Sequence, residues 1–245
     1  VWTTSRPALS WVEASPADSL APAPPQPRYY QTVAGRKLAG RTLHAVRVRG
    51  LQPGTGYRYR IFSQEVQSWP DVNNVTYGKT VDADAARRRA YGFRTFPAAG
   101  SACSFLVLND IHGKADYLTR LCKHVDFSEL GFVAFNGDMS SSVESGEQLF
   151  KAYLDASAAL FAAETPILFT RGNHETRGVF ADSLGDYFPG QDGRFYGIYR
   201  YGDVCILLLD CGEDKPDDHA EYNGLADYDA YRIEECEWLK KAVRS

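Results

Sequence analysis

The chain has 245 residues, of which 44% are hydrophobic, and a formal net charge of −4. This length suits one large domain or two ordinary ones, and no apolar run approaches the length of a membrane-spanning helix. The charge is unevenly divided: residues 1–97 carry 14 Lys and Arg against 6 Asp and Glu, whereas residues 98–245 carry 13 against 25. This break in composition predicts a domain boundary near Pro97.

The spacing of cysteines and arginines argues against a cysteine-based zinc or disulfide site and against a nucleic-acid-binding site. Five cysteines without a C-x-x-C spacing argue against a zinc ribbon or a dense disulfide framework. We expect Cys103 and Cys205 to be small buried side chains in strands. The arginine run at residues 87–89 is too short to indicate nucleic-acid binding. The chain begins with Val1 and has no signal-peptide pattern, which we interpret as a processed or excised piece of a longer protein.

Residues 1–97 are predicted to be all-β. Segments in which apolar and polar residues nearly alternate, as in half-buried strands, occur at 10–13, 43–48, 57–62 and 92–96. The run Leu51-Gln52-Pro53-Gly54-Thr55-Gly56-Tyr57 resembles the corner of fibronectin type III domains, in which a Tyr bonds back to the backbone. With the early Trp11, this resemblance implies a fibronectin-III-like β-sandwich; a generic β-sandwich is the alternative.

From Cys103 onward the pattern changes to strands alternating with helices, which indicates βαβ units. Strands are predicted at 103–108, 131–136 and 166–170. Helices are predicted at 115–124, 146–163 and 231–243. A β-hairpin is expected around Tyr201-Gly202-Asp203.

Three short polar motifs follow the three predicted strands: Asn109-Asp110-Ile111-His112-Gly113, Asn136-Gly137-Asp138 and Arg171-Gly172-Asn173-His174-Glu175. Open α/β sheets gather their ligand sites along the edge where such strands end. Carboxylate, imidazole and amide oxygen together suit a hard-to-borderline metal ion. One such motif alone is explained by Asp, Asn and Gly in loop turns, but three in succession predict a metal site.

In order and spacing, the motifs resemble the calcineurin-like metallophosphoesterase superfamily. The resemblance implies that residues 101–245 form the N-terminal part of a catalytic domain with an incomplete four-layer α/β/β/α fold. It implies two divalent ions (Mn, Zn or Fe) and hydrolysis of phosphate mono- or diesters by a metal-bound water or hydroxide. The implied metal ligands are Asp110, His112, Asp138 as the bridging carboxylate, and Asn173.

The same resemblance implies roles for neighbouring residues. His174 would face the substrate, where it would stabilise the transition state or assist the leaving group. Glu175 would orient a neighbour. Glycines would let the backbone turn sharply beside the metals at Gly113, Gly137 and Gly172. Arg171 and Arg177 flank the third motif and are candidates for contact with phosphate.

The chain departs from the family pattern after His174. The only later histidine is His219, whereas the family continues with a further His and a G-H-x-H pair. We therefore expect His219 at the surface, a chain truncated before the last His motifs, and weak metal binding. The alternative function is a non-catalytic binding module that retains the phosphoesterase fold.

Other features of the chain support coarser expectations. His44 and His124 have no motif context and are expected at the surface of a strand and a helix. The expected partner is a small phosphorylated substrate, without nucleic acid. A sandwich before a phosphoesterase domain resembles purple acid phosphatases, which by analogy implies a periplasmic or secreted protein.

The ligand set predicts a colourless protein. Purple acid phosphatases carry D-x-G in the first motif and a Tyr three residues after the bridging Asp, whose Fe(III)–phenolate bond gives the colour. Here the first motif is Asp110-Ile111-His112, and the position three after Asp138 is Ser141. We expect no visible charge-transfer band when the protein is loaded with Fe in air and its absorption spectrum is recorded. A phenolate-type band would contradict this ligand set.

Overall fold

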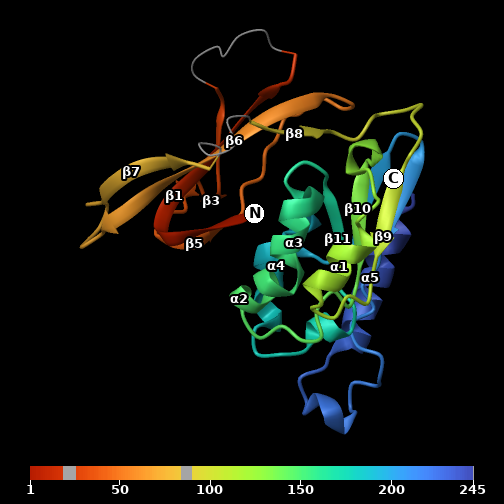
Figure 1. The fold of residues 1–245 in the computed structure, drawn as a ribbon. Helices are drawn as coiled ribbons and strands as arrows, with labels where there is room; N and C mark the ends of the chain where they lie inside the picture. The colour runs from red at the N-terminus through yellow and green to blue at the C-terminus, as the bar shows by residue number, and fades with distance from the viewer. Residues whose placement is uncertain (19–25, 84–89, 245) are drawn as a thin grey trace. The chain divides into compact units, whose positions relative to one another are not determined.

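The computed structural model describes residues 1–18, 26–83 and 90–244, and the chain divides into two compact units, Val1–Pro97 and Ala98–Ser245 (Figure 1). The arginine run at residues 87–89 lies outside the described residues. Among the described residues, no helix is long and apolar enough to cross a membrane.

The first unit is built on two long antiparallel strands, β1 (Trp2–Pro16) and β6 (Gly56–Ser68), which pair from Ala8 opposite Glu65 to Pro16 opposite Tyr57. Four shorter strands extend them into one six-stranded sheet: β2 (Arg28–Tyr30) and β5 (Arg41–His44) on β1, and β7 (Thr76–Asp82) and β8 (Tyr91–Arg94) on β6. A separate pair is β3 (Thr32–Val33) with β4 (Arg36–Lys37). The unit is therefore sheet-rich, and the fibronectin-III-like sandwich remains a prediction.

The hydrogen bond expected from the 51–57 corner is present. Tyr57 is 6% exposed at the start of β6, and its hydroxyl accepts a hydrogen bond of 2.8 Å from the backbone N–H of Gln52. Trp11 is buried on β1 and stacks on Phe62 with 5.4 Å between ring centroids. Burial of Trp11 and Tyr57 stabilises the pairing of β1 with β6, since apolar burial is the main favourable term in folding.

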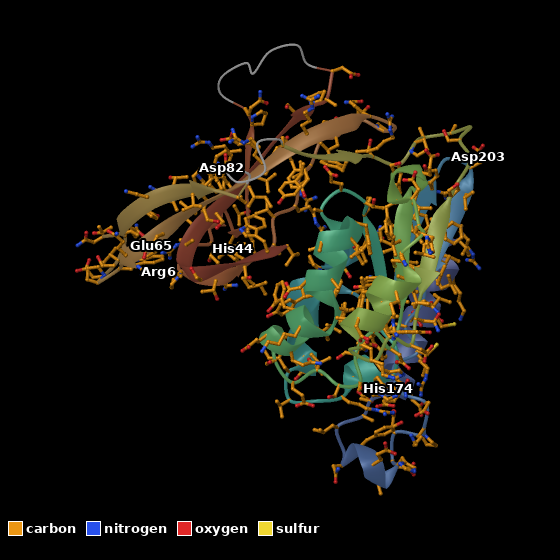
Figure 2. The ribbon with its side chains drawn as sticks, viewed as in Figure 1. Arg6, His44, Glu65, Asp82, His174 and Asp203 are labelled. Carbon is orange, nitrogen blue, oxygen red and sulfur yellow. The ribbon has the colours of Figure 1, made fainter. Side chains whose placement is uncertain are left out.

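His44 is buried, so the prediction that it lies on a strand surface is wrong. Pairing of β1 with β5 sets Trp2 opposite His44, and the two rings lie 5.5 Å apart. The ring nitrogen Nε2 lies 3.0 Å from Thr4 Oγ1. Burial lowers the pKa of His44 to about 4, because water no longer stabilises the charged imidazole. Figure 2 labels His44 among the side chains of this unit, with the ion pair of Arg6 and Glu65.

The second unit contains a parallel sheet with strand order β11–β10–β9: β9 (Phe105–Leu108), β10 (Phe132–Asn136) and β11 (Ile167–Thr170). All three strands were predicted. Their carboxyl ends meet at one edge, because Leu108 pairs with Phe135, and Asn136 pairs with Thr170. Parallel strands need covering layers, and helices provide them here.

Helices α1 (Ala115–Leu121) and α2 (Gly146–Leu149) through α3 (Asp155–Ser157) pack against this sheet (Figure 1). The longer helix starts at Ser145, whose hydroxyl accepts a hydrogen bond from the Gln148 N–H. It continues through the π-helical segments Phe150–Leu154 and Ala158–Ala162, so the predicted helix over 146–163 is confirmed. Its buried side chains meet those of the strands in one core with Val133, Phe135 and Phe169.

The expected hairpin is formed by β12 (Gly197–Tyr201) and β13 (Val204–Leu208), and the last helix is α5 (Tyr228–Ala242). Tyr196 joins them: its ring lies 4.9 Å from that of Trp238 on α5. Cys205 is exposed on β13 and Cys103 is half-buried, so the prediction of two buried cysteines is wrong. Alternating side chains on an edge strand face opposite ways, and Cys205 lies on the open face.

Between these elements lie short helices: 3-10 segments Phe127–Glu129, His174–Thr176, Ala181–Ser183, Gln191–Gly193 and Ala220–Tyr222, and α4 (Leu184–Tyr187). The segment His174–Thr176 matters most for the site. It begins four residues after the end of β11 at Thr170 and carries two of the motif residues.

Replacing Tyr57 by Phe tests the corner of the first unit. Since the hydroxyl of a buried Tyr is lost and the Gln52 N–H loses its acceptor, we expect the free energy of unfolding to fall by about 1 kcal/mol. Chemical denaturation followed by Trp fluorescence measures the change. The matched control is Tyr77→Phe, whose side chain is 39% exposed. Equal effects of the two substitutions would contradict the role of the corner.

Candidate metal centre

Two loops that follow parallel strands are hydrogen-bonded to each other beyond the sheet. After β9 and β10, the N–H groups of Asp110, His112 and Gly113 donate to the carbonyls of Gly137, Asp138 and Met139, at 3.3, 3.0 and 2.8 Å. The first two motifs thus continue the pairing of the strands that carry them. Their side chains are held at one edge of the sheet, as the motif positions predict.

Glycines allow the second and third motifs to approach closely. A Cβ on Gly137 would lie 2.7 Å from the Cα of Gly172, closer than packed atoms allow. Gly113 and Gly137 have positive φ angles of 73° and 81°, which confirms the expected sharp turns. Gly172 has another reason: a Cβ there would collide with the carboxylate and backbone N of Asp138. Both backbones therefore come together without intervening side chains.

Three motif residues hold a backbone conformation that L-amino acids rarely adopt. Asp110, His112 and Asp138 have φ angles of 56°, 50° and 55°. The left-handed region costs a non-glycine residue about 1 kcal/mol or more. Glycine would avoid this steric cost, so the presence of Asp, His and Asp here favours a role for their side chains. Strained residues gathered at one place point to a functional site.

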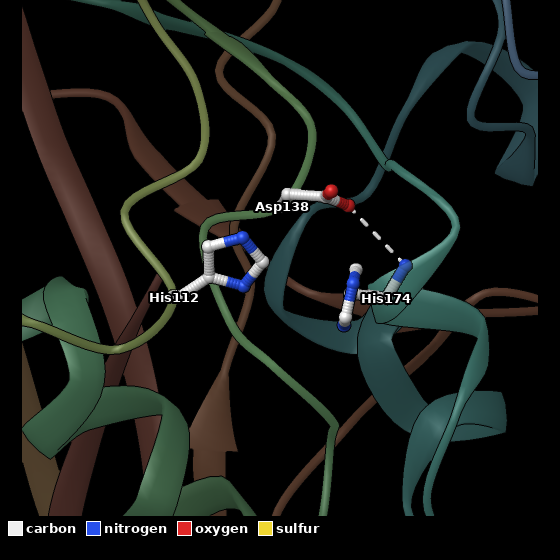
Figure 3. Close-up of side chains that lie close together, drawn as sticks. All are labelled: His112, Asp138 and His174. Atoms are coloured by element: carbon white, nitrogen blue, oxygen red, sulfur yellow. Dashed lines mark hydrogen bonds between the residues drawn. The ribbon is translucent and has the colours of Figure 1, made fainter.

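Side chains from the three loops form one cluster. His112, Asp138 and His174 each offer a ligand atom, and these atoms all lie within 4.8 Å of one another (Figure 3). The imidazole rings of His112 and His174 are nearly perpendicular, with centroids 4.7 Å apart. The backbone N–H of His174 donates to Asp138 Oδ1 at 3.2 Å. Two imidazoles and a carboxylate are a donor set suited to Zn²⁺, Mn²⁺ or Fe²⁺.

Of the two remaining predicted ligands, Asp110 lies beside His112, and Asn173 lies next to His174 in the sequence. Asp110 Oδ1 is 3.6 Å from His112 Nε2, its side chain is 60% exposed, and Asn109 donates a hydrogen bond to its other oxygen. Asn173 is half-buried and precedes the turn His174–Thr176, where its side chain makes no capping hydrogen bond. Its amide oxygen is thus not committed to the helix start.

His174 is held by the backbone of the second loop. Its Nδ1 lies 2.9 Å from the carbonyl oxygen of Ser141. A carbonyl can only accept, so Nδ1 carries the proton and Nε2 is the nitrogen available for other chemistry. His174 was predicted to face the substrate, and its presence in the cluster also makes its ring a potential ligand.

Glu175 connects the loop after β10 with the loop after β11 through hydrogen bonds. It is fully buried, and its carboxylate accepts hydrogen bonds from three backbone N–H groups: Asp138 at 2.8 Å, Ser140 at 2.9 Å and Gly172 at 2.8 Å. Burial raises the pKa of Glu175, and the three hydrogen bonds oppose this rise. The sequence suggested that Glu175 orients one neighbour; it binds the backbone of two loops.

Arg171 and Arg177 are both paired with buried carboxylates. Arg171 Nε donates to Asp210 at 2.6 Å, and Arg177 makes two hydrogen bonds to Glu213, at 2.7 and 2.9 Å. Both guanidinium groups are engaged within the protein, which does not favour the suggested contact with phosphate.

Asp210 and Glu213 have no place in the sequence-based site. The available signal was a carboxylate at the end of an apolar strand-like run, since Asp210 follows Leu207-Leu208-Leu209. That position corresponds to the positions of Asp110 and Asp138 after their strands. His219 is exposed and precedes the turn Ala220–Tyr222, and His124 is exposed after α1, so both predictions of surface positions are confirmed.

An open pocket adjoins the first motif. Its volume is about 430 Å³, and it is lined by Gly113, Ser145, Glu147, Gln148, Lys151 and Ala152. Gly113 follows His112 in the sequence, while the side chains of His112, Asp138 and His174 do not line this pocket. Its polar side chains come from the start of the long helix.

Comparison with known proteins gives one family. The model of the calcineurin-like phosphoesterases matches residues 103–242, which include all three motifs and the elements from β9 to α5. No curated protein matches the chain.

The role of Glu175 can be tested with Glu175→Gln. An amide at this position turns N–H groups toward backbone N–H donors, so we expect a loss of about 2 kcal/mol in the free energy of unfolding. Urea denaturation measures it, with Glu147→Gln on an exposed helix face as the control, for which a change under about 0.5 kcal/mol is expected. A small effect at Glu175 would show that the loops hold together without its carboxylate.

Proposed function

The chain belongs to the calcineurin-like phosphoesterase family, and from this we propose that it hydrolyses esters of phosphate with two divalent metal ions at the edge where β9, β10 and β11 end. The observation that carries the proposal is the cluster of His112, Asp138 and His174. The family supports metal-dependent phosphoester hydrolysis in general. The number of ions, the role of each residue and the substrate are the specific parts of this proposal.

In this proposal Asp110 and His112 would hold one ion, Asn173 would hold the other, and the carboxylate of Asp138 would serve both. The donor chemistry supports it, since carboxylate, imidazole and amide oxygen fit Mn²⁺, Zn²⁺ or Fe²⁺. The left-handed backbone of Asp110, His112 and Asp138 supports it as well, because a non-glycine residue adopts this conformation at a steric cost that glycine does not have. Bound ions would supply Lewis-acid activation of water and neutralise charge on the phosphate.

His174 is proposed to act on the substrate. With Nδ1 donating to the carbonyl of Ser141, its Nε2 can carry the proton that a departing alkoxide requires. In the protonated state it would also stabilise negative charge that develops on the phosphate oxygens. The alternative use of the same nitrogen is metal ligation.

The substrate is proposed to be a small phosphorylated molecule. The pocket beside Gly113 offers room for its organic part, with the polar groups of Gln148, Glu147 and Lys151 along its wall. Whether the ester is a mono- or a diester is tested below.

A periplasmic or secreted location and a fibronectin-III-like identity of the first unit rest on analogy with similar architectures.

The second candidate function is a binding module without catalysis. It is favoured by one observation: His219, which alone follows His174 among the histidines, is exposed outside the cluster. Under this alternative, the fold is retained and turnover is absent. The two functions differ in what they predict for a metal-loaded protein.

Equilibrium titration with Mn²⁺, with free ion measured by electron paramagnetic resonance, tests the metal centre. We expect the wild-type chain to bind Mn²⁺ weakly and Asp138→Asn to raise the dissociation constant by about tenfold or more, because a ligand charge is lost. The control is Asp155→Asn, an exposed residue on the long helix. Indistinguishable titrations of Asp138→Asn and wild type would contradict the proposed site.

Elemental analysis after Mn²⁺ loading and desalting, together with hydrolysis of p-nitrophenyl phosphate and bis(p-nitrophenyl) phosphate, completes the test. Two retained ions would indicate a full ligand set. The ester that is hydrolysed identifies the substrate class. Metal binding without turnover of either ester would favour the binding module.

A further inference from the structure

The segment of residues 171–177 carries three residues of the site and is only seven residues long. It starts where β11 ends at Thr170 and contains Asn173, His174 and Glu175. Glu175 fixes the middle of this segment from below. An arginine stands at each end, Arg171 and Arg177.

The first end is fixed by Asp210, whose side chain is completely buried. Asp210 Oδ2 accepts from Arg171 Nε at 2.6 Å and from the hydroxyl of Tyr231 at 2.9 Å, while Oδ1 accepts from the Gly212 N–H at 2.9 Å. The guanidinium carbon of Arg171 lies 4.8 Å from the ring centroid of Phe195. Arg171 is therefore held by a charge pair and by a cation–π contact, in a site with little water.

The second end is fixed by Glu213, whose side chain is 2% exposed. Arg177 binds it through Nε and Nη2, and the Thr176 hydroxyl donates to the same Oε1 at 2.9 Å. The hydroxyl of Tyr222 donates to Oε2 at 3.3 Å. A bidentate arginine–carboxylate pair sets both distance and orientation, because the two planar groups must align.

Both carboxylates belong to one short stretch after β13. Asp210 is bound in turn to α5, since its N–H donates to the buried Glu235 at 2.6 Å and Tyr231 is one turn away on the same helix. Thr170 adds a bond from β11 to the carbonyl of Leu209, at 2.8 Å. Both ends of the segment 171–177 are thus bound to the same short stretch after β13.

We propose that Asp210 and Glu213 form a carboxylate clamp, a pair of positioning residues that hold Asn173 and His174 in register with Asp138 through Arg171 and Arg177. The inference rests on the proposed function for the meaning of that register. Metal and substrate groups require placement within about 0.5 Å, which a loop of this length does not provide by itself. Buried carboxylates are costly unless fully paired, and these two are used where the pairing orders the site.

The clamp is tested with Glu213→Gln, Asp210→Asn and Tyr231→Phe, the last of which removes only a hydroxyl that touches Asp210. Two properties are measured: the Mn²⁺ dissociation constant by electron paramagnetic resonance, and hydrogen exchange of peptides covering residues 171–177. We expect the dissociation constant to rise by about tenfold in Glu213→Gln and Asp210→Asn, and less in Tyr231→Phe. Exchange in 171–177 should become about tenfold faster, while residues 146–162 stay unchanged.

The control is Phe161→Leu, a core substitution in the long helix that lowers the melting temperature without touching the clamp. It should leave Mn²⁺ affinity and exchange in 171–177 as in wild type. Clamp variants with a lower melting temperature but with either exchange in 171–177 or Mn²⁺ affinity unchanged would overturn the proposal. If Asp210→Asn does not fold, Glu213→Gln and Tyr231→Phe decide between these results.

Failure of the clamp and failure of the proposed function are distinguishable. A wild-type chain without Mn²⁺ binding contradicts the function, and the exchange measurement still decides whether the clamp orders residues 171–177. Wild-type binding that the clamp variants retain in full overturns the clamp alone.

Discussion

One buried carboxylate underlies the geometry of the site. Glu175 accepts hydrogen bonds from the N–H groups of Asp138, Ser140 and Gly172, so it binds the loop after β10 to the loop after β11. A buried carboxylate is unfavourable by itself, and the three donors offset its lost hydration. The loop after β9 is then held indirectly, because its N–H groups donate to the carbonyls of residues 137–139. Removing the Glu175 carboxylate would therefore weaken the hydrogen bonds that hold all three loops together.

Around this centre, the protein uses charge in two different ways. Asp138 and Asp110 are partly or largely accessible and are suited to a cation from solution. Glu175, Asp210 and Glu213 are buried and paired with N–H or guanidinium groups of the protein. The acidity of the second unit, 25 Asp and Glu against 13 Lys and Arg, is therefore not simply surplus surface charge. Part of it forms the interior frame of the site.

Much of this arrangement was predictable, because strand ends and polar motifs follow local rules. The three parallel strands, the long helix and the hairpin are specified by apolar periodicity and turn residues. The order of the motifs was sufficient to predict that His112 and Asp138 lie close together. Strand β7 was missed because Gly78 and Lys79 interrupt its alternating pattern. Residues 45–48 have an alternating pattern but do not form a strand, since β5 ends at His44.

What depends on tertiary contacts was not predictable. Burial of His44 depends on Trp2 and Thr4, about forty residues away. The pairing of Arg171 with Asp210 and of Arg177 with Glu213 joins residues 39 and 36 positions apart. A single sequence contains no signal for such partners. The exposed face of β13 that carries Cys205 likewise follows from which sides of the hairpin are covered.

The left-handed backbone at Asp110, His112 and Asp138 sets a conflict for anyone who engineers this protein. A procedure that considers backbone conformation alone would favour glycine at these three positions, since glycine adopts positive φ without a steric penalty. Each such replacement would remove a donor atom of the proposed metal centre. Stabilising libraries of this chain should keep these positions fixed and seek gains elsewhere.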